Sequence, residues 1–203
     1  AVAGASTGLS ASASSPVIEL DFQPEITTQA ASRFVTEGDA FVDGLTVAVT
    51  KGTWIHLDGN PIEVTATGTL YGPFDEQPTE SDTPPAGAPV AGTETVTLTG
   101  AGSYTSPGTI TAPESGFYTW VWAIDKAAHG EQAKYLTDSF TDRFGQVAET
   151  SVVPFQPVAV SEADQRLAIP GDALTDTITV SSSNGAWLKK DGAHIPVVFE
   201  GTA

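Results

Sequence analysis

Carboxylates at short spacing are the first residues in this sequence that could do chemistry. Asp39 and Asp43 lie four residues apart, and Asp172 and Asp176 repeat that spacing further along the chain. Carboxylate oxygens are ligands that calcium prefers, so these four side chains are candidate calcium ligands. Each pair, however, begins with a Gly-Asp turn signal, and the sequence has no loop of the D-x-D-x-D-G kind. We therefore favour turn and strand-end roles for these residues, and expect neither a metal site nor a cofactor.

Motifs that support catalysis are absent from the sequence. The three histidines, His56, His129 and His194, belong to no H-E-x-x-H metal motif. The sequence contains no G-x-S-x-G nucleophile turn and no glycine-rich phosphate loop. It also contains no Cys, which excludes disulfides, thiolate catalysis and Cys-based zinc sites. We expect a protein that is not an enzyme.

One stretch, GFYTWVWAID at residues 116–125, is rich in aromatic side chains. Tyr118, Trp120 and Trp122 alternate with smaller residues and would lie on one face of a strand. A buried strand is the ordinary interpretation of this pattern. The alternative is an exposed aromatic face that binds a sugar or another protein.

The charge of the chain limits its partners. The formal net charge is -17, with only 8 Lys and Arg residues. Nucleic acids and anionic membrane surfaces are bound mainly through Lys and Arg, so neither is an expected partner. We expect no membrane insertion either, because no apolar run approaches the roughly 18 residues of a membrane helix. Acidity without cysteine fits an extracellular protein, and such proteins are common on Gram-positive cell surfaces.

The elements that must position these residues are short strands. Residues 1–16 are almost all Ala, Ser, Gly and Thr and predict a linker. After them, short runs rich in Val, Ile, Thr and aromatics are separated by Gly, Pro, Asp and Asn, which predicts an antiparallel all-β fold. The best helix candidate is residues 126–136. The proline-rich, acidic residues 72–92 predict a long exposed excursion between two strands.

An internal repeat is the strongest signal in the sequence. Residues 155–203 align with residues 22–70 at an offset of 133 without gaps, and 19 of 49 positions are identical. The tripeptide Phe-Gln-Pro begins both copies, and a Gly-x-Trp motif recurs in each. A period of 133 is a typical length for a β-sandwich domain. The repetition of Trp54 as Trp187 favours a packing role for both over a sugar-binding one.

The repeat predicts the domain organisation. We expect a complete β-sandwich repeat over residues 17–154 and the N-terminal part of a second repeat over residues 155–203. Half a sandwich leaves an apolar face and strand edges uncovered. A neighbouring repeat, or a second molecule that exchanges strands in a filament, would cover them.

Several segments carry a resemblance to a known family. PEITTQA, DGLTV, ATGTLYGP, APESGFYTWVW and VAETSVVPF resemble the tandem domains of actinobacterial wall-anchored surface proteins. Their layout is similar to the VaFE-type repeats of Gram-positive adhesins and pilins. The resemblance implies immunoglobulin-like sandwiches that are joined into a stalk projecting from the cell wall.

The resemblance also implies a possible covalent crosslink between the first and last strands. Some such domains form a Thr–Gln ester and others a Lys–Asn isopeptide. Here Thr27 or Thr28 stands at the first-strand position, and Glu149 stands where the ester domains have Gln. No histidine lies between Asp138 and Phe144, and no Lys lies in the first strand. Between a crosslinked and an uncrosslinked sandwich, we favour the sandwich without a crosslink.

Two functions follow from these observations. The first is a non-catalytic structural module of a bacterial surface stalk or filament, whose partners are neighbouring repeats or other copies of itself. The alternative is an extracellular module that binds a host protein or glycan through the aromatic strand or the 72–92 excursion.

Overall fold

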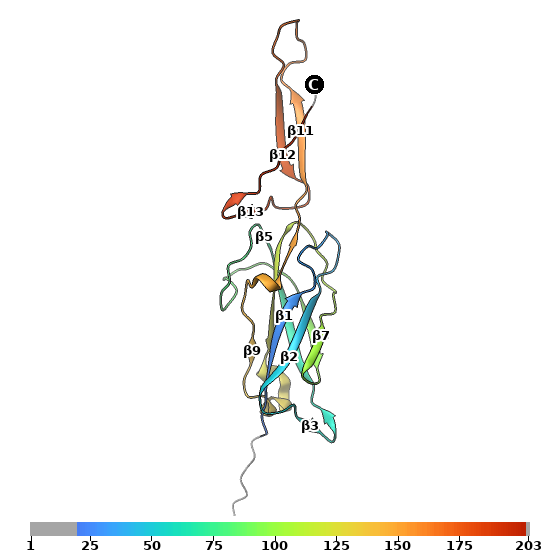
Figure 1. Ribbon diagram of the computed structural model, residues 1–203, viewed down its shortest axis with the longest axis vertical. Helices are drawn as coiled ribbons and strands as arrows, with labels where there is room; N and C mark the ends of the chain where they lie inside the picture. Colours follow the sequence, from blue (N-terminus) through green and yellow to red (C-terminus); the bar gives the residue numbers. More distant parts are fainter. Residues whose placement is uncertain (1–19, 202–203) are drawn as a thin grey trace, which may run out of the picture.

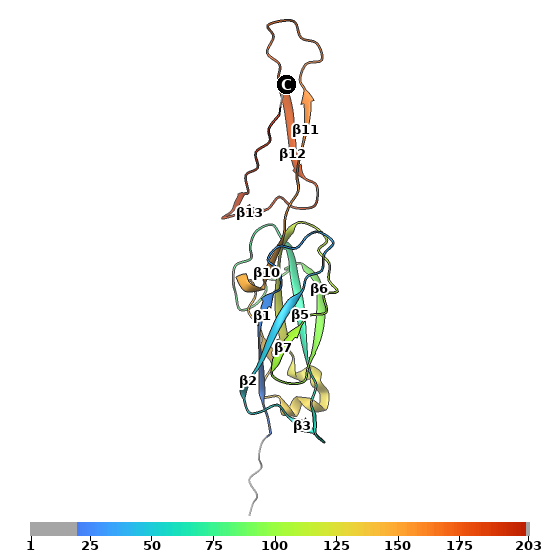
Figure 2. The ribbon, with the colours of Figure 1, turned by 45° about the vertical axis from the view of Figure 1, so that its right-hand side comes forward.

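The computed structural model describes residues 20–201, so the predicted linker at residues 1–16 lies outside the described residues. The described chain is mostly strand, and its strands pair antiparallel, which confirms the predicted all-β class. We call residues 20–154 the body and residues 155–201 the C-terminal unit. Figures 1 and 2 show the body at one end of an elongated molecule and the C-terminal unit beyond it on the same long axis.

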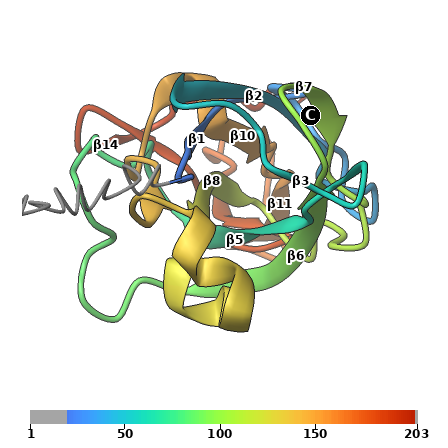
Figure 3. The ribbon, with the colours of Figure 1, turned by 90° about the horizontal axis from the view of Figure 1, so that it is seen from below.

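The body contains two antiparallel sheets. One has the order β1-β2-β7, formed by Gln23–Ala30, Asp43–Lys51 and Gly102–Thr105. The other has the order β10-β8-β5-β6, with β9 also paired to β8. Its strands are β5 (Val64–Phe74), β6 (Val90–Leu98), β8 (Gly116–Ile124), β9 (Phe140–Thr141) and β10 (Thr150–Val153). Figure 3, viewed along the long axis, shows β1, β2 and β7 on one side and β5 and β6 on the other.

Sequence alternation decides which side chains fill the space between the sheets. In β2, Asp43, Leu45 and Val47 are buried while the residues between them are more exposed. The core contains residues of both sheets, such as Ile26 and Leu45 from the first and Leu70 from the second. Burial of these apolar faces on each other is the main force that holds the two sheets together.

The aromatic strand β8 is the centre of this core. Tyr118, Trp120 and Trp122 are each no more than 1% exposed. The rings of Trp120 and Trp122 stack at a centroid distance of 5.5 Å. The interpretation of this stripe as an exposed binding face is therefore wrong, because β8 lies between β10 and β5 and its aromatic side faces the first sheet.

Short elements close the ends of the body. The predicted helix at 126–136 is the 3₁₀ helix η1 (Lys126–Tyr135), which lies at the end remote from the C-terminal unit (Figures 1 and 3). A two-residue pair, β3 (His56–Leu57) with β4 (Asn60–Pro61), lies at the same end. A second short 3₁₀ helix, η2 (Val147–Glu149), leads directly into β10.

The acidic excursion is shorter and more firmly attached than the sequence predicts. β5 continues to Phe74 and β6 begins at Val90, so both ends of residues 72–92 belong to strands. In the loop between them, Ser81 forms a bridge with Phe144. The Arg143 guanidinium contacts the carboxylates of Glu80 and Asp82. These contacts hold the middle of the loop against the body.

The C-terminal unit consists of two strand pairs. β11 (Pro157–Ala163) pairs with β12 (Asp176–Ser182), and β13 (Lys189–Lys190) pairs with β14 (Ala193–His194). Figure 1 shows β11 and β12 extending away from the body, with β13 close to the junction. Most side chains of the β11–β12 hairpin are exposed, including apolar ones such as Ile178 and Val180.

Candidate functional site

Three polar residues from separate segments of the body meet at one edge of its core. Thr28 and Asp43 lie on adjacent strands, where the register pairs Thr28 with Leu45 and Ala30 with Asp43. Residues two apart on a strand share a face, so Thr28 and Asp43 are diagonal neighbours. Glu149 is the last residue of η2, immediately before β10. We call Thr28, Asp43 and Glu149 the carboxyl cluster.

Asp43 is fully buried in this cluster. Its Oδ2 accepts a hydrogen bond of 2.7 Å from the indole Nε1 of Trp122. Its backbone nitrogen donates to Ser106 Oγ at 3.0 Å. This bond crosses the core, because it joins Asp43 on β2 of the first sheet to Trp122 on β8 of the second sheet. Buried carboxylates require such partners, because their desolvation is otherwise strongly unfavourable.

Glu149 is the second buried carboxyl of the cluster and is 2% exposed. Its side chain lies beside those of Thr28 and Asp43, both of which influence its pKa. The hydroxyl of Thr28 also lies 3.2 Å from Asp142 Oδ2, to which it can donate. The half-buried hydroxyl thus stands between two carboxyl groups, one at the surface and one in the core.

Burial changes the ionisation of both core acids. Desolvation and the nearby negative charge of Asp43 raise the pKa of Glu149 to about 8. Desolvation raises the pKa of Asp43 to about 6, although its bond from Trp122 opposes the rise. Within the described residues, Asp43 Oδ1 and Glu149 Oε2 have no hydrogen-bond donor. Protonation of Glu149 removes the charge repulsion between these two buried carboxyl groups.

This arrangement permits one particular chemistry besides hydrogen bonding. At neutral pH, Glu149 is a neutral acid whose carbonyl carbon is electrophilic, and Asp43 is the ionised neighbour that could accept a proton. The Thr28 hydroxyl is the adjacent nucleophile. A nucleophile beside an acid and a base is the set of groups that an acyl transfer uses.

The structure brings together some of the residues that the sequence singled out. Thr28 and Glu149, two of the three crosslink candidates, are in the cluster. Thr27 is not, since it is exposed and its hydroxyl lies 3.4 Å from Thr46 O. Sequence reasoning missed the role of Asp43 beside them. The available signal was a single acidic residue at an inward position of an otherwise apolar β2 pattern.

The four calcium candidates do not form a common site. Within residues 20–201, no group of three or more His, Cys, Asp or Glu side chains is arranged to hold a metal ion. Asp39 is exposed at a turn, where its backbone nitrogen donates to Thr36 O. Asp172 has a similar position, and its Oδ2 accepts from the Ile169 nitrogen at 3.0 Å. Asp176 is exposed on β12.

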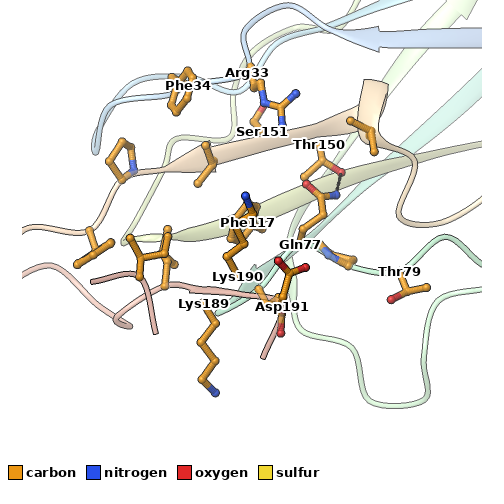
Figure 4. A pocket seen from close by; sticks show the side chains of 18 residues that line it. Arg33, Phe34, Gln77, Thr79, Phe117, Thr150, Ser151, Lys189, Lys190 and Asp191 are labelled. Carbon is orange, nitrogen blue, oxygen red and sulfur yellow. Dashed lines mark hydrogen bonds between the residues drawn. The ribbon is translucent and has the colours of Figure 1, made fainter. Parts of the chain in front are cut away.

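A cavity of about 830 Å³ lies where the body meets the C-terminal unit. Figure 4 shows Arg33, Thr150 and Ser151 from the body on one side and Lys190 and Asp191 from the C-terminal unit on the other. The Gln77 amide crosses part of it and donates to Thr150 Oγ1 at 3.1 Å. Its walls combine apolar side chains with both signs of charge, so the cavity does not select one class of ligand.

Comparison with known proteins finds no matching family model, no significantly similar curated protein and no significantly similar solved structure. Among the described residues, no helix combines the length and the apolar character needed to cross a membrane.

Proposed function

We propose that this chain is a structural module of a bacterial surface stalk, built from immunoglobulin-like β-sandwich repeats joined end to end. The body is one complete repeat, and the C-terminal unit is the first part of the next. The protein bears mechanical load or acts as a spacer, and it is not an enzyme. Its acidity fits an exposed extracellular location, and its lack of cysteine is compatible with a Gram-positive cell surface.

Strand pairing at the repeat offset of 133 supports this proposal. β1 pairs with β2 so that Ile26 lies opposite Val47. β11 pairs with β12 so that Ala159, the residue 133 positions later, lies opposite Val180, the counterpart of Val47. β13 and β14 stand at the positions of β3 and β4 in the same way. The two segments thus adopt the same strand register.

Side-chain packing at the same offset supports it further. The rings of Phe22 and Trp54 lie 4.9 Å apart, and so do the rings of Phe155 and Trp187. The indole of Trp54 donates to Ile62 O at 2.9 Å, and that of Trp187 donates to Ile195 O at 2.8 Å. Both tryptophans therefore act as packing residues and not as sugar platforms.

The junction is the observation that carries the proposal. Ser115 donates from its nitrogen to Asn184 O at 2.7 Å and from its Oγ to Ala186 O at 2.8 Å. The Lys189 nitrogen donates to Asp75 O at 2.7 Å. These contacts fix the C-terminal unit on the long axis of the body (Figures 1 and 2). A rigid, axial connection between like units is what a stalk requires.

Small-angle scattering of the 203-residue protein tests this function. We expect a rod-like particle whose maximum dimension matches the extended arrangement in Figure 1. A chain that carries further copies of the repeat should lengthen by a constant increment per copy. A compact particle, or one whose dimensions show free bending at the junction, would contradict the proposal.

The carboxyl cluster supports a second property of the same module, a covalent closure of the body. We propose that Thr28 Oγ1 attacks Cδ of protonated Glu149 while the hydroxyl proton of Thr28 passes to the Asp43 carboxylate. Asp43 then returns that proton to the departing hydroxyl of Glu149, which leaves as water. One carbon–oxygen bond forms and one breaks, so no oxidant is required. The ester would join β1 directly to the start of β10.

Intact mass measurement decides whether this bond forms. We expect the purified protein to be lighter than its sequence by one water molecule. Thr28→Val should have the full sequence mass, whereas Thr27→Val should keep the loss because Thr27 lies outside the cluster. A wild-type protein with the full sequence mass would show that the cluster is held by hydrogen bonds alone.

A further inference from the structure

The inner face of the β11–β12 hairpin is an apolar surface that nothing in the described residues covers. Ala159 lies opposite Val180 and Ser161 opposite Ile178, so these four side chains share one face. Ile178 is 58% exposed and Val180 is 48% exposed. Two-stranded hairpins are marginal in water unless such a face is packed against another element.

The body shows what covers the same face in the first copy. The residues 133 positions earlier are Ile26, Thr28, Leu45 and Val47, and the three apolar ones are at most 3% exposed. They belong to the same core as Trp120 and Trp122 of β8. The covering element is therefore the second sheet, most of which is formed by residues 71–154.

The polar groups of the hairpin repeat two of the three positions of the carboxyl cluster. Asp176 lies opposite Ala163, as Asp43 lies opposite Ala30. Ser161 stands at the position of Thr28 and retains a hydroxyl. In the body, this aspartate receives an indole N–H from Trp122 and a carboxyl contact from Glu149. Asp176, in contrast, is exposed and has no hydrogen bond from an indole in the described residues.

A glycine marks where the missing indole would lie. Gly68 faces Trp122 so closely that a Cβ at this position would lie 2.5 Å from the indole Cζ2. Gly201 is its counterpart at the offset of 133, and a Cβ there would meet nothing within 4 Å. The C-terminal unit thus keeps a glycine at a position where the body needs room for a tryptophan.

We propose that the inner face of the β11–β12 hairpin docks a sheet-forming segment of the 71–154 type, supplied by the same polypeptide. This segment supplies a tryptophan that packs against Gly201 and donates its indole N–H to Asp176. It also supplies a carboxyl or carboxamide group that contacts Ser161. The inference rests on the proposed repeat and adds the identity of its partner. A second copy of this chain is a poorer fit, because its own second sheet is already covered by β1 and β2.

Single engineered cysteines test the proposal, because the chain has no native Cys. Val180→Cys places a thiol on the inner face, and Val160→Cys places one on the outer face of the same hairpin, where Val160 is 69% exposed. Each is made in the 203-residue protein and in a chain extended after Ala203 by a repeat of residues 71–154. The rate of thiol labelling is measured in all four proteins.

We expect Val180→Cys to label at least about 100-fold more slowly in the extended chain than in the 203-residue chain, because labelling then requires local opening. Val160→Cys should label equally in both. In the extended chain, Asp176→Ala should restore part of the lost reactivity, whereas Asp191→Ala should not.

Two results would overturn the inference. Unchanged labelling of Val180→Cys in the extended chain would show that this segment does not cover the face. Slow labelling in the 203-residue chain that accelerates on dilution would show that a second copy covers it. Scattering of the 203-residue chain reports on the axial arrangement independently, so failure of the docking proposal and failure of the stalk proposal give different results.

Discussion

At the residue scale, Gly68 on β5 leaves room for the indole of Trp122, its partner on the neighbouring strand β8. We predict that Gly68→Ala lowers stability by roughly 2 to 4 kcal/mol, because a methyl group would overlap an indole that is fully buried. Thermal unfolding followed by circular dichroism measures the change. Gly100→Ala is the matched control, since a Cβ there meets nothing within 4 Å. Equal melting temperatures for the two variants would contradict this account of Gly68.

The carboxyl cluster makes the stability of the body depend on pH. The pKa of Glu149 is raised from 4.5 to about 8 and that of Asp43 from 3.8 to about 6. Between the ordinary and the raised pKa of each acid, the folded state therefore binds more protons than the unfolded state. The contribution of the two acids to the stability of the fold is complete at acidic pH and is lost as the pH rises towards 8. In the absence of an ester, we predict that the free energy of unfolding falls by roughly a few kcal/mol between pH 5 and pH 8.

Glu149→Gln tests the origin of this slope. The amide stays neutral at every pH, so we expect the decline between pH 6 and 8 to become much shallower and the variant to exceed the wild type in stability at pH 8. Denaturant unfolding across this range provides the free energies. Glu63→Gln, a change at an exposed residue, should leave the slope intact. A wild type that already lacks the slope would instead agree with a covalent Thr28–Glu149 bond, which removes the titrating group.

At the element scale, Glu94 on β6 holds the loop that follows β7. Its carboxylate, 4% exposed, accepts from the backbone nitrogens of Gly108, Thr109 and Ile110 and from the Thr109 hydroxyl. We predict that Glu94→Ala costs about 2 to 3 kcal/mol, because three backbone N–H groups would lose their charged acceptor. Faster amide hydrogen exchange at Thr109 and Ile110, without a matching change in β8, would localise the effect. Glu63→Ala is the control, and uniform exchange changes across the body would contradict the local role.

The elements show which parts of the structure can be predicted from the sequence. Alternation in β2 and the β-branched, aromatic run of β8 are local patterns, so strands and the all-β class follow from them. Thr28 and Glu149 were named together only as crosslink candidates, through a resemblance, because the two residues are distant in sequence. The tertiary fold decides that Asp43 joins them and that Tyr118, Trp120 and Trp122 face inward. A run of aromatic residues does not by itself show whether another sheet covers the strand.

The acidic excursion illustrates the same limit. Proline and glycine in residues 72–92 predict irregular backbone, and the loop between β5 and β6 is irregular. Its attachment through Ser81 and Arg143 depends on a segment some sixty residues away. Side-chain contacts at that separation follow from the packing of the sheets, which composition does not specify.

At the scale of the whole molecule, the stiffness of the junction depends on a close approach at Gly185. Its φ is 125°, and a Cβ there would lie 2.7 Å from Ser115 Oγ and 3.0 Å from the Ser115 nitrogen. Gly52, its counterpart in the body, approaches the segment before β1 in the same way, with a Cβ position 2.4 Å from Asp21 O. Gly52 therefore allows a close approach to the segment before β1, and Gly185 allows a close approach to the body.

We predict that Gly185→Ala loosens the junction without unfolding the body. The added methyl group would separate Ser115 from Asn184 and Ala186, whose two hydrogen bonds help to fix the axial arrangement. Amide exchange at Ser115 and Lys189 should accelerate by at least about tenfold, as expected for a local opening, while exchange in β5 and β8 stays unchanged. Scattering should show a wider distribution of particle lengths. Gly201→Ala is the control, because a Cβ there has free space and no positive φ. Because the proposed stalk function depends on a rigid connection, unchanged exchange at Ser115 in Gly185→Ala would show that other contacts set the geometry of the junction.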